Sequence, residues 1–183
     1  MGRRTGRRDD QIAAGPLIRT ERLLLRRARP EDTEAFHAIM RDPRAMRYWS
    51  TPPHATLDET REWVASMAED DPAAREDFVI ELNGRAIGKA GCYRLPEIGY
   101  ILHPDHWGKG YAHEAMAAVI AHIFAARDVE KITADVDPRN QASIGLLLRL
   151  GFTETHRAKG TWQVGDELCD SVYFALKRPR SVE

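Results

Sequence analysis

The spacing of apolar residues along the first third of the chain predicts one strand followed by two helices. The strand covers Leu17 to Arg27, around three consecutive leucines. A helix begins at Pro30 and ends at Pro43, and its apolar residues recur at three- and four-residue spacing. Thr56 then caps a second helix, since Glu59 follows three residues later and completes a capping box.

The middle of the chain predicts a meander of three antiparallel strands. Strands are expected at residues 78–82 and 85–93, separated by Asn83-Gly84, a pair typical of tight hairpin turns. Leu95-Pro96 turns the chain again, and a third strand covers residues 97–102.

The last third alternates between helical and extended patterns. It predicts helices at residues 112–126 and 141–150, the second capped by Gly151, and strands at residues 131–137, 152–156 and 167–176. A loop around Lys159-Gly160-Thr161 is expected to join the last two strands. The whole order predicts an α+β fold with a mixed sheet.

A glycine-bearing loop, Trp107-Gly108-Lys109-Gly110-Tyr111-Ala112, connects the third meander strand to the following helix. A glycine loop at a helix start gathers unpaired backbone N–H groups at the positive end of the helix dipole, which suits an anion such as phosphate. The loop lacks the Gly-Lys-Ser/Thr ending of a nucleotide P-loop and the dinucleotide fingerprint. Taken alone, it fits a tight strand-to-helix connection equally well.

Composition narrows the class of protein. A chain of 183 residues with 43% hydrophobic and 30% charged residues suits one domain with a real core. The net charge of −1 gives no general attraction for nucleic acid, and no apolar run is long enough to span a membrane. Two cysteines make no disulfide framework, so a cytoplasmic setting is expected. Residues 1–15 hold four arginines and are expected to be a disordered basic tail, either merely solvated or able to touch nucleic acid.

A second segment decides how the glycine loop is interpreted. Residues 136–152 contain Asn140, Ser143 and the run Leu150-Gly151-Phe152. Together the two segments resemble the GCN5-related N-acetyltransferases (GNAT), in particular the RimJ/RimL-type branch that acetylates N-terminal amines of ribosomal proteins. That family's phosphate loop is Arg/Gln-x-x-Gly-x-Gly/Ala, and this chain departs from it only at Trp107.

The resemblance extends from Leu17 to Lys177 and implies a fold. It predicts a single domain over residues 16–178, with a mixed, mostly antiparallel sheet of about seven strands flanked by about four helices. Residues 179–183 would then be a short C-terminal tail. The late strands of this fold often pair between subunits, so a homodimer is left open; Trp162 would lie in such a contact or pack on its own chain.

Acetyl-CoA, as acyl donor, is the cofactor that the resemblance implies. The backbone amides of Gly108 to Ala112 would hold its pyrophosphate, and the main chain of Tyr100, Ile101 and Leu102 would pair with the pantetheine arm, as would Asn140 and Ser143. No metal is expected: His103 and His106 lie three residues apart, but Pro104 breaks helical geometry between them.

Two residues are predicted to be catalytic. By the resemblance, Ser143 donates a hydrogen bond to the coenzyme A sulfur, since the tyrosine used by many relatives is replaced here by Leu147; Tyr173 is held in reserve. Glu97 is the expected base for the amine, acting through water. The alternatives stay open: a helix serine bonded to its own backbone, and a strand-end glutamate that only attracts a cationic substrate.

The acceptor is expected to be a primary amine, on a protein N-terminus or a small molecule. Tyr48, Trp49 and Glu97 would line its site, although the two aromatic residues suit core packing as well. Two other classes remain: a non-catalytic acyl-CoA-binding protein of the same fold, and a nucleic-acid-associated protein that uses the arginine tail.

Overall fold

The structure, a computed structural model, describes residues 17–68 and 75–179 and is built on an eight-stranded sheet. The strand order is β1-β2-β3-β4-β5-β6-β8-β7, and every neighbouring pair is antiparallel except β5 and β6. The strands are β1 (Ile18–Arg19), β2 (Leu24–Arg26), β3 (Glu76–Leu82), β4 (Arg85–Arg94), β5 (Glu97–Leu102), β6 (Lys131–Val136), β7 (Thr153–Val164) and β8 (Glu167–Lys177).

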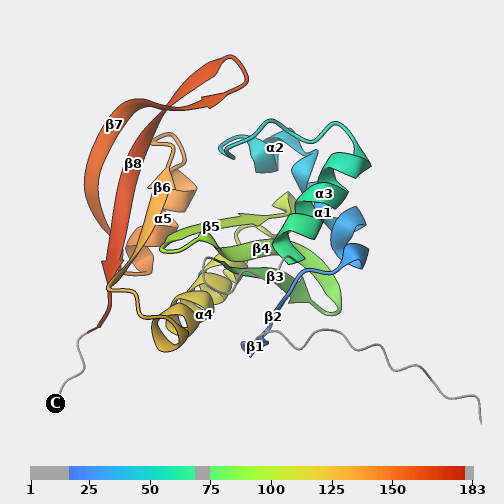
Figure 1. Cartoon of the computed structure of the whole chain (residues 1–183), viewed down its shortest axis with the longest axis horizontal. Helices are drawn as coiled ribbons and strands as arrows, with labels where there is room; N and C mark the ends of the chain where they lie inside the picture. Colours follow the sequence, from blue (N-terminus) through green and yellow to red (C-terminus); the bar gives the residue numbers. More distant parts are fainter. Residues whose placement is uncertain (1–16, 69–74, 180–183) are drawn as a thin grey trace, which may run out of the picture.

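Helices cover both faces of this sheet (Figure 1). The described part of the chain has α1 (Thr33–Met40), α2 (Pro43–Met46), α3 (Leu57–Ala68), α4 (Tyr111–Ala126) and α5 (Gln141–Arg149), with short 3-10 turns at η1 (Pro30–Asp32) and η2 (Pro104–His106). Because side chains alternate along a strand, Phe78 and Ile80 of β3 pack with α4 and α5, while Val79 packs with α1 and α3. The α+β prediction with a mixed, mostly antiparallel sheet is confirmed.

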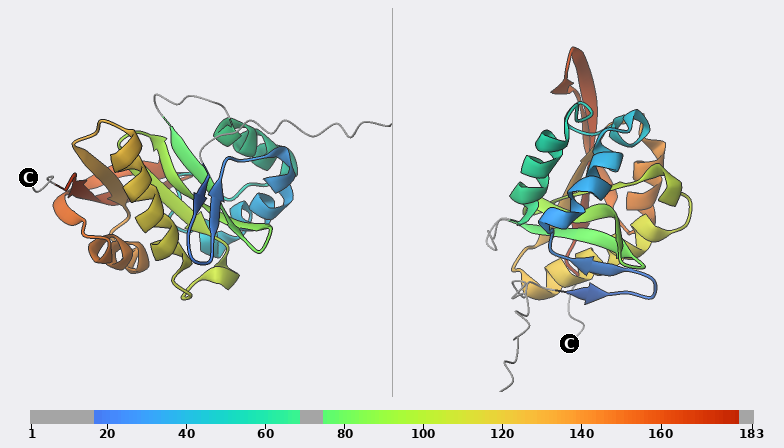
Figure 2. Two further views of the ribbon diagram at one scale, coloured as in Figure 1. Left: turned by 90° about the horizontal axis from the view of Figure 1, so that it is seen from below. Right: turned by 90° about the vertical axis from the view of Figure 1, so that its right-hand side faces the viewer.

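The predicted first strand is wrong in one respect: residues 17–27 form two short strands. Ile18 pairs with Leu25 and Arg19 with Leu24, so β1 and β2 make a hairpin at the edge of the sheet (Figure 2). The turn is closed by Thr20, whose N–H donates to the carbonyl of Leu23 (3.0 Å). The turn lies in the polar residues 20–22 before the leucine run, and it was missed because the predicted strand was extended across them.

Pro43 does not simply end a helix, as the sequence predicted; it also starts α2. Asp42 is the N-cap, and its side chain accepts a hydrogen bond from the N–H of Arg44 (2.8 Å). Proline suits the first helical position because its missing N–H has no partner there anyway. The capping box at α3 is confirmed, since the Thr56 hydroxyl accepts from the N–H of Glu59 (3.2 Å).

The predicted loop around Lys159-Gly160-Thr161 is also wrong, because β7 continues through it. Gly160 lies at a register shift in the ladder, has φ +60° and donates its N–H to Asp170 (2.9 Å). The chain reverses instead at residues 165–166, between Val164 and Glu167. The two long strands therefore form an arm that projects beyond the rest of the sheet (Figures 1 and 2).

The sheet separates in its middle, between β5 and β6. These parallel strands share one residue pair, Glu97 with Thr133, whereas β5 remains paired with β4 as far as Leu102 and β6 with β8 over its whole length. The N–H of Thr133 also donates to the carbonyl of Pro96 (2.9 Å). The two strands diverge beyond this point and leave the β6-facing edge of β5 without a strand partner.

Several predictions concern segments at the margins of the structure. Residues 1–15 and all but the first residue of the 179–183 tail lie outside the described residues, so the domain limits stay a prediction.

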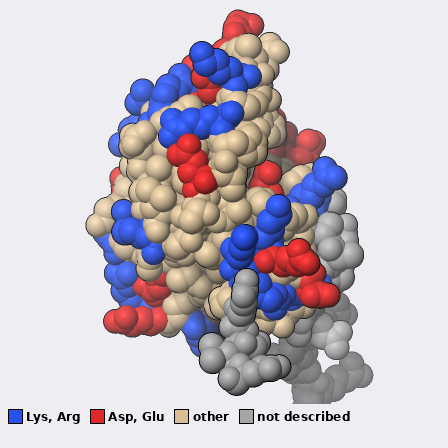
Figure 3. Space-filling view, turned by 90° about the vertical axis from the view of Figure 1, so that its left-hand side faces the viewer, with Lys and Arg blue, Asp and Glu red and all other residues tan. Residues whose placement is uncertain are grey.

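Within residues 17–68 and 75–179, no helix is both long and apolar enough to cross a bilayer. On the face that carries β7, Lys and Arg are interspersed with Asp and Glu (Figure 3).

A glycine pair beside this divergence gives the first prediction. Gly91 of β4 has φ +152°, and a Cβ there would lie 2.0 Å from the carbonyl oxygen of Glu76. Gly91→Ala should therefore lower the free energy of unfolding by at least about 2 kcal/mol, measured by urea denaturation. Gly99→Ala is the matched control, because Gly99 pairs with Gly91 across the ladder and a Cβ there meets nothing within 4 Å. Equal losses for the two variants would contradict the steric account.

Candidate active site

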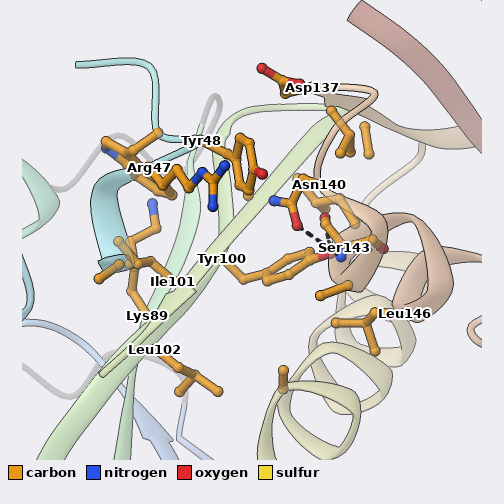
Figure 4. A pocket seen from close by; sticks show the side chains of 18 of the residues that line it. Arg47, Tyr48, Lys89, Tyr100, Ile101, Leu102, Asp137, Asn140, Ser143 and Leu146 are labelled. Carbon is orange, nitrogen blue, oxygen red and sulfur yellow. Dashed lines mark hydrogen bonds between the residues drawn. The ribbon is translucent and has the colours of Figure 1, made fainter. Parts of the chain in front are cut away.

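A cleft of about 1860 Å³ opens where β5 and β6 diverge (Figure 4). It is lined by β5 and the glycine loop, by β6 and the start of α5, by residues 43–51 around α2, and by the β7–β8 arm. Of the residues predicted to form the site, all line this cleft except Lys109: Tyr48, Trp49, Glu97, Tyr100, Ile101, Leu102, Trp107, Gly108, Gly110, Tyr111, Ala112, Asn140 and Ser143.

The glycine loop lies at one end of the cleft and leads directly into α4. Gly108 has φ +70° and Gly110 has φ +81°, so both occupy the left-handed region that favours glycine. Gly110 is the N-cap of α4, so the first helical turn, with amides that have no partner within the helix, begins at residues that line the cleft. The indole N–H of Trp107 donates to the carbonyl of Leu102 (3.0 Å) and ties the loop to the end of β5.

A polar cluster between the N-terminal hairpin and α4 holds this loop in place. Glu114 of α4 accepts hydrogen bonds from the Thr20 hydroxyl (2.6 Å) and from the Arg22 N–H (2.8 Å) and Nε (2.7 Å). Arg22 also donates to the carbonyl of Lys109 (2.9 Å), and its guanidinium lies 4.6 Å from the centre of the Tyr111 ring. Sequence reasoning missed Arg22, since Arg22 and Glu114 are 92 positions apart and neither belongs to a motif.

The side chain of Lys109 is not aimed at the cleft. Its Nζ donates to the carbonyl of Asp105 (2.7 Å). The side chain therefore connects two parts of the loop and does not add a cation to the predicted phosphate site. Glu114, in the first turn of α4, has a structural role as the partner of Arg22.

The opposite wall is the first turn of α5. Asn140 is the N-cap, and its side chain accepts the N–H of Ser143 (3.1 Å). The Ser143 hydroxyl lies 2.5 Å from the phenol oxygen of Tyr100, which reaches across from β5. Tyr173, the reserve tyrosine, stacks on His156 at 4.3 Å and does not line the cleft.

Glu97 lies at the point where the two strands part. Its carboxylate reaches solvent, yet the surrounding protein displaces part of its hydration and the nearby Asp135 adds a like charge; both effects raise the pKa of Glu97. Asp135 on β6 is held by the arm, because the indole N–H of Trp162 donates to its Oδ2 (2.7 Å). Its Oδ1 is buried and has no hydrogen-bond partner among the described residues.

Aromatic rings and a buried ion pair form the wall on the side of α1–α3. Lys89 of β4 is 4% exposed; its Nζ lies 2.8 Å from Asp77 and 5.9 Å from the ring centres of Trp49 and Trp63. The guanidinium groups of Arg47 and Arg139 lie 5.2 and 5.9 Å from the centre of the Tyr48 ring. Tyr48 and Trp49 therefore face the cleft, as predicted for an acceptor site, and Lys89 is a lining residue that the sequence did not suggest.

The arrangement of His103 and Cys92 is fixed by local structure and by burial. No group of three or more His, Cys, Asp or Glu side chains in residues 17–68 and 75–179 is arranged to hold a metal ion. His103 accepts the N–H of Asp105 through its Nδ1 (3.2 Å), which fixes its ring in the η2 turn. Burial raises the pKa of the Cys92 thiol to about 12, so Cys92 is not a nucleophile near neutral pH.

A comparison with known protein families shows which family the chain belongs to. The family model described as an acetyltransferase (GNAT) domain matches residues 22–153. The chain belongs to the GNAT acetyltransferase family. The resemblance inferred from the two motifs is thus confirmed, and this chain is an N-acetyltransferase of the GNAT family.

Relatives of this GNAT protein agree in length and fold. The uncharacterized N-acetyltransferase p20 of Bacillus licheniformis is 29% identical over 166 residues, which cover 86% of this chain and 93% of p20. Spermidine N(1)-acetyltransferase of Escherichia coli is 28% identical over 138 residues, covering 70% and 72%. A structure of RimL, a ribosomal L7/L12 α-N-protein acetyltransferase in complex with coenzyme A, has a TM-score of 0.78 at 20% identity, covering 88% and 98%; this match supports the fold alone.

The like charges of Glu97 and Asp135 in the cleft give the second prediction. In Asp135→Asn the like charge beside Glu97 is removed, so the pKa of Glu97 should fall below its wild-type value while staying above that of a free glutamate because of partial burial. Carboxylate NMR titration measures this directly. Glu167→Gln is the control, since Glu167 lines the same cleft but is paired with Arg139. An unchanged Glu97 titration in Asp135→Asn would mean that the two carboxylates do not interact.

Proposed function

We propose that acetyl-CoA lies with its pyrophosphate on the amides of residues 108–112 and its pantetheine arm along the free edge of β5. The observation that carries this proposal is the divergence of β5 and β6 beside the glycine loop. Beyond Glu97 the backbone N–H and C=O groups of β5 that face β6 lack a strand partner, and a pantetheine amide can pair with them. The loop adds helix-terminus amides suited to phosphate.

The acetyl group is transferred by direct attack of a primary amine on the thioester carbonyl. As the C–N bond forms, the amine nitrogen gives a proton, through a water molecule, to Glu97, whose pKa is raised by partial burial and by the charge of Asp135. The C–S bond then breaks and its electron pair stays on sulfur. Ser143 donates a hydrogen bond to that sulfur, and the thiolate takes up a proton from water to release coenzyme A.

The acceptor amine enters on the side of Tyr48 and Trp49, next to Glu97. The carboxylates of Glu97 and Asp135 attract a cationic ammonium group, and the aromatic rings offer apolar contact to what carries it. Two of the three relatives named above, RimL and the spermidine acetyltransferase, have names that specify a protein α-amine and a polyamine as acceptor. Short peptides with free N-termini and spermidine are therefore the acceptors to test, with thiol release as the assay.

The cofactor site gives the third prediction. At a hundredfold excess over its dissociation constant, acetyl-CoA should stabilise the protein by about 2.7 kcal/mol, seen as a higher thermal midpoint. Gly108→Asp should abolish most of this stabilisation, because it places a negative charge where the pyrophosphate binds. A side chain at Gly108 meets nothing within 4 Å, so the change brings no steric clash, only the backbone strain of a non-glycine residue at φ +70°.

Gly108→Asn is the matched control, as asparagine has the size of aspartate, carries no charge and adopts positive φ comparably well. It should keep most of the acetyl-CoA stabilisation. Equal stabilisation of the aspartate and asparagine variants would place the pyrophosphate elsewhere, and no shift of the wild type at millimolar acetyl-CoA would remove the proposed cofactor site.

The base gives the fourth prediction. Glu97→Gln should lower kcat/KM by about 100-fold, the scale of general base catalysis. In the wild type kcat/KM should fall on acidification as Glu97 takes up a proton; because its pKa is raised, this fall begins at a higher pH than for an ordinary glutamate. The variant should lose that acidic limb and keep only the titration of the amine itself.

Glu154→Gln serves as the control, because Glu154 lies on β7, pairs with Arg157 and is not among the cleft residues. It should have wild-type kinetics. If Glu97→Gln keeps both the rate and the acidic limb, Glu97 only attracts the acceptor or plays no part, and another group accepts the proton.

A further inference from the structure

The side chain of Tyr100 makes a contact that the expected main-chain role does not use. Its phenol oxygen lies 2.5 Å from the Ser143 hydroxyl and 3.4 Å from the Ser143 carbonyl, so it connects β5 to the first turn of α5 (Figure 4). The two residues are 43 positions apart. The ring of Tyr100 packs on the core cluster that contains α4 and α5, which fixes the direction of its hydroxyl.

This contact changes what the Ser143 hydroxyl can do. A serine in a helix commonly bonds to a backbone carbonyl of the preceding turn, and its proton is then occupied. Here the Oγ meets a phenol, and the N–H of the same residue is already bonded to the Asn140 side chain. A hydroxyl has one proton and two acceptor lone pairs. If the phenol donates to Oγ, the serine proton is free to point into the cleft.

The phenol is well suited to act as that donor. Burial raises the pKa of Tyr100 to about 12, and the Ser143 hydrogen bond opposes this only in part. Tyr100 therefore stays protonated through the neutral and mildly alkaline range in which amines become nucleophilic. Hydrogen bonds in series also polarise one another, so a serine that accepts from the phenol is a stronger donor to a third atom.

We propose that Tyr100 is a positioning residue of acetyl transfer, whose phenol donates to Ser143 Oγ and thereby directs the serine proton to the thioester sulfur. The inference rests on the proposed role of Ser143 toward coenzyme A. Neither hydroxyl loses its proton: the bond chain runs from the phenol to Oγ and from Oγ to sulfur as the C–S bond breaks. Leu147, one turn further along α5, is buried and has no hydroxyl, and the phenol reaches Ser143 from the strand.

The test is a double-mutant cycle with Tyr100→Phe, Ser143→Ala and the double variant, which is the fifth prediction. Phenylalanine keeps the ring that packs in the core, so folding and acetyl-CoA binding should persist. Each single variant should lower kcat by at least about 10-fold, with the KM for acetyl-CoA changed by less than about twofold. Because the two hydroxyls act as one chain, the double variant should be no slower than the slower single variant.

Tyr173→Phe is the matched control, since Tyr173 lies outside the cleft on β8 and loses the same hydroxyl. It should turn over like the wild type. Single losses that multiply in the double variant, or a Tyr100→Phe effect confined to KM or to the thermal midpoint, would show that the phenol only supports packing.

The outcomes separate this inference from the proposed function. A wild type that releases thiol, together with a Tyr100→Phe variant of unchanged kcat, overturns the role of Tyr100 alone. Normal kcat in Ser143→Ala overturns both the serine role and the chain through it. A wild type that binds acetyl-CoA but releases no thiol with any tested peptide or spermidine removes the proposed acceptors, and the Tyr100 inference falls with them.

Discussion

The arrest of strand pairing between β5 and β6 is the constraint on which the site depends. Two parallel strands with one shared residue pair would normally be a weak point of a sheet. Here β5 is held on its other side by β4 and β6 is held by β8, so the walls of the cleft are fixed although its middle is open. The N–H of Thr133 bonded to the carbonyl of Pro96 closes the end of the opening where Glu97 lies. The same separation thus supplies unpaired backbone for a ligand and a carboxylate beside it.

The glycine loop depends on a second constraint, which comes from the N-terminal hairpin. Isolated exposed ion pairs contribute little, and Arg22 is partly exposed. Its effect comes from geometry rather than strength: Glu114 is held by Thr20 and by two groups of Arg22, while the same arginine binds the carbonyl of Lys109. One side chain therefore connects the helix start to the loop before it. This holds the segment that contains the two left-handed glycines, and Arg22 and Glu114 also line the cleft beside it.

Turns, caps and loops that depend on neighbouring residues can be predicted from the sequence, whereas contacts between residues far apart in the chain cannot. Asn83-Gly84, the Thr56 capping box and the loop at residues 107–112 each follow from residues within a few positions, and the structure has all three. Gly160 misled because a glycine with positive φ serves equally in a turn or in a strand irregularity, and only the partner strand decides. Arg22 with Glu114 and Tyr100 with Ser143 are contacts across 92 and 43 positions, and no periodicity encodes them.

Two groups in the cleft have raised pKa values, and the same physical cause gives them opposite uses. Partial burial and the charge of Asp135 destabilise the anion of Glu97, so its carboxylate gains affinity for a proton. Burial destabilises the anion of Tyr100 as well, but a phenol starts far above neutral pH, so raising its pKa makes it permanently a donor. A raised pKa brings the carboxylate base closer to the working pH, whereas it moves the phenol donor further above that pH. The divergence of β5 and β6 places the two at separate positions on one strand, three residues apart in sequence, where proton removal and sulfur departure require different chemistry.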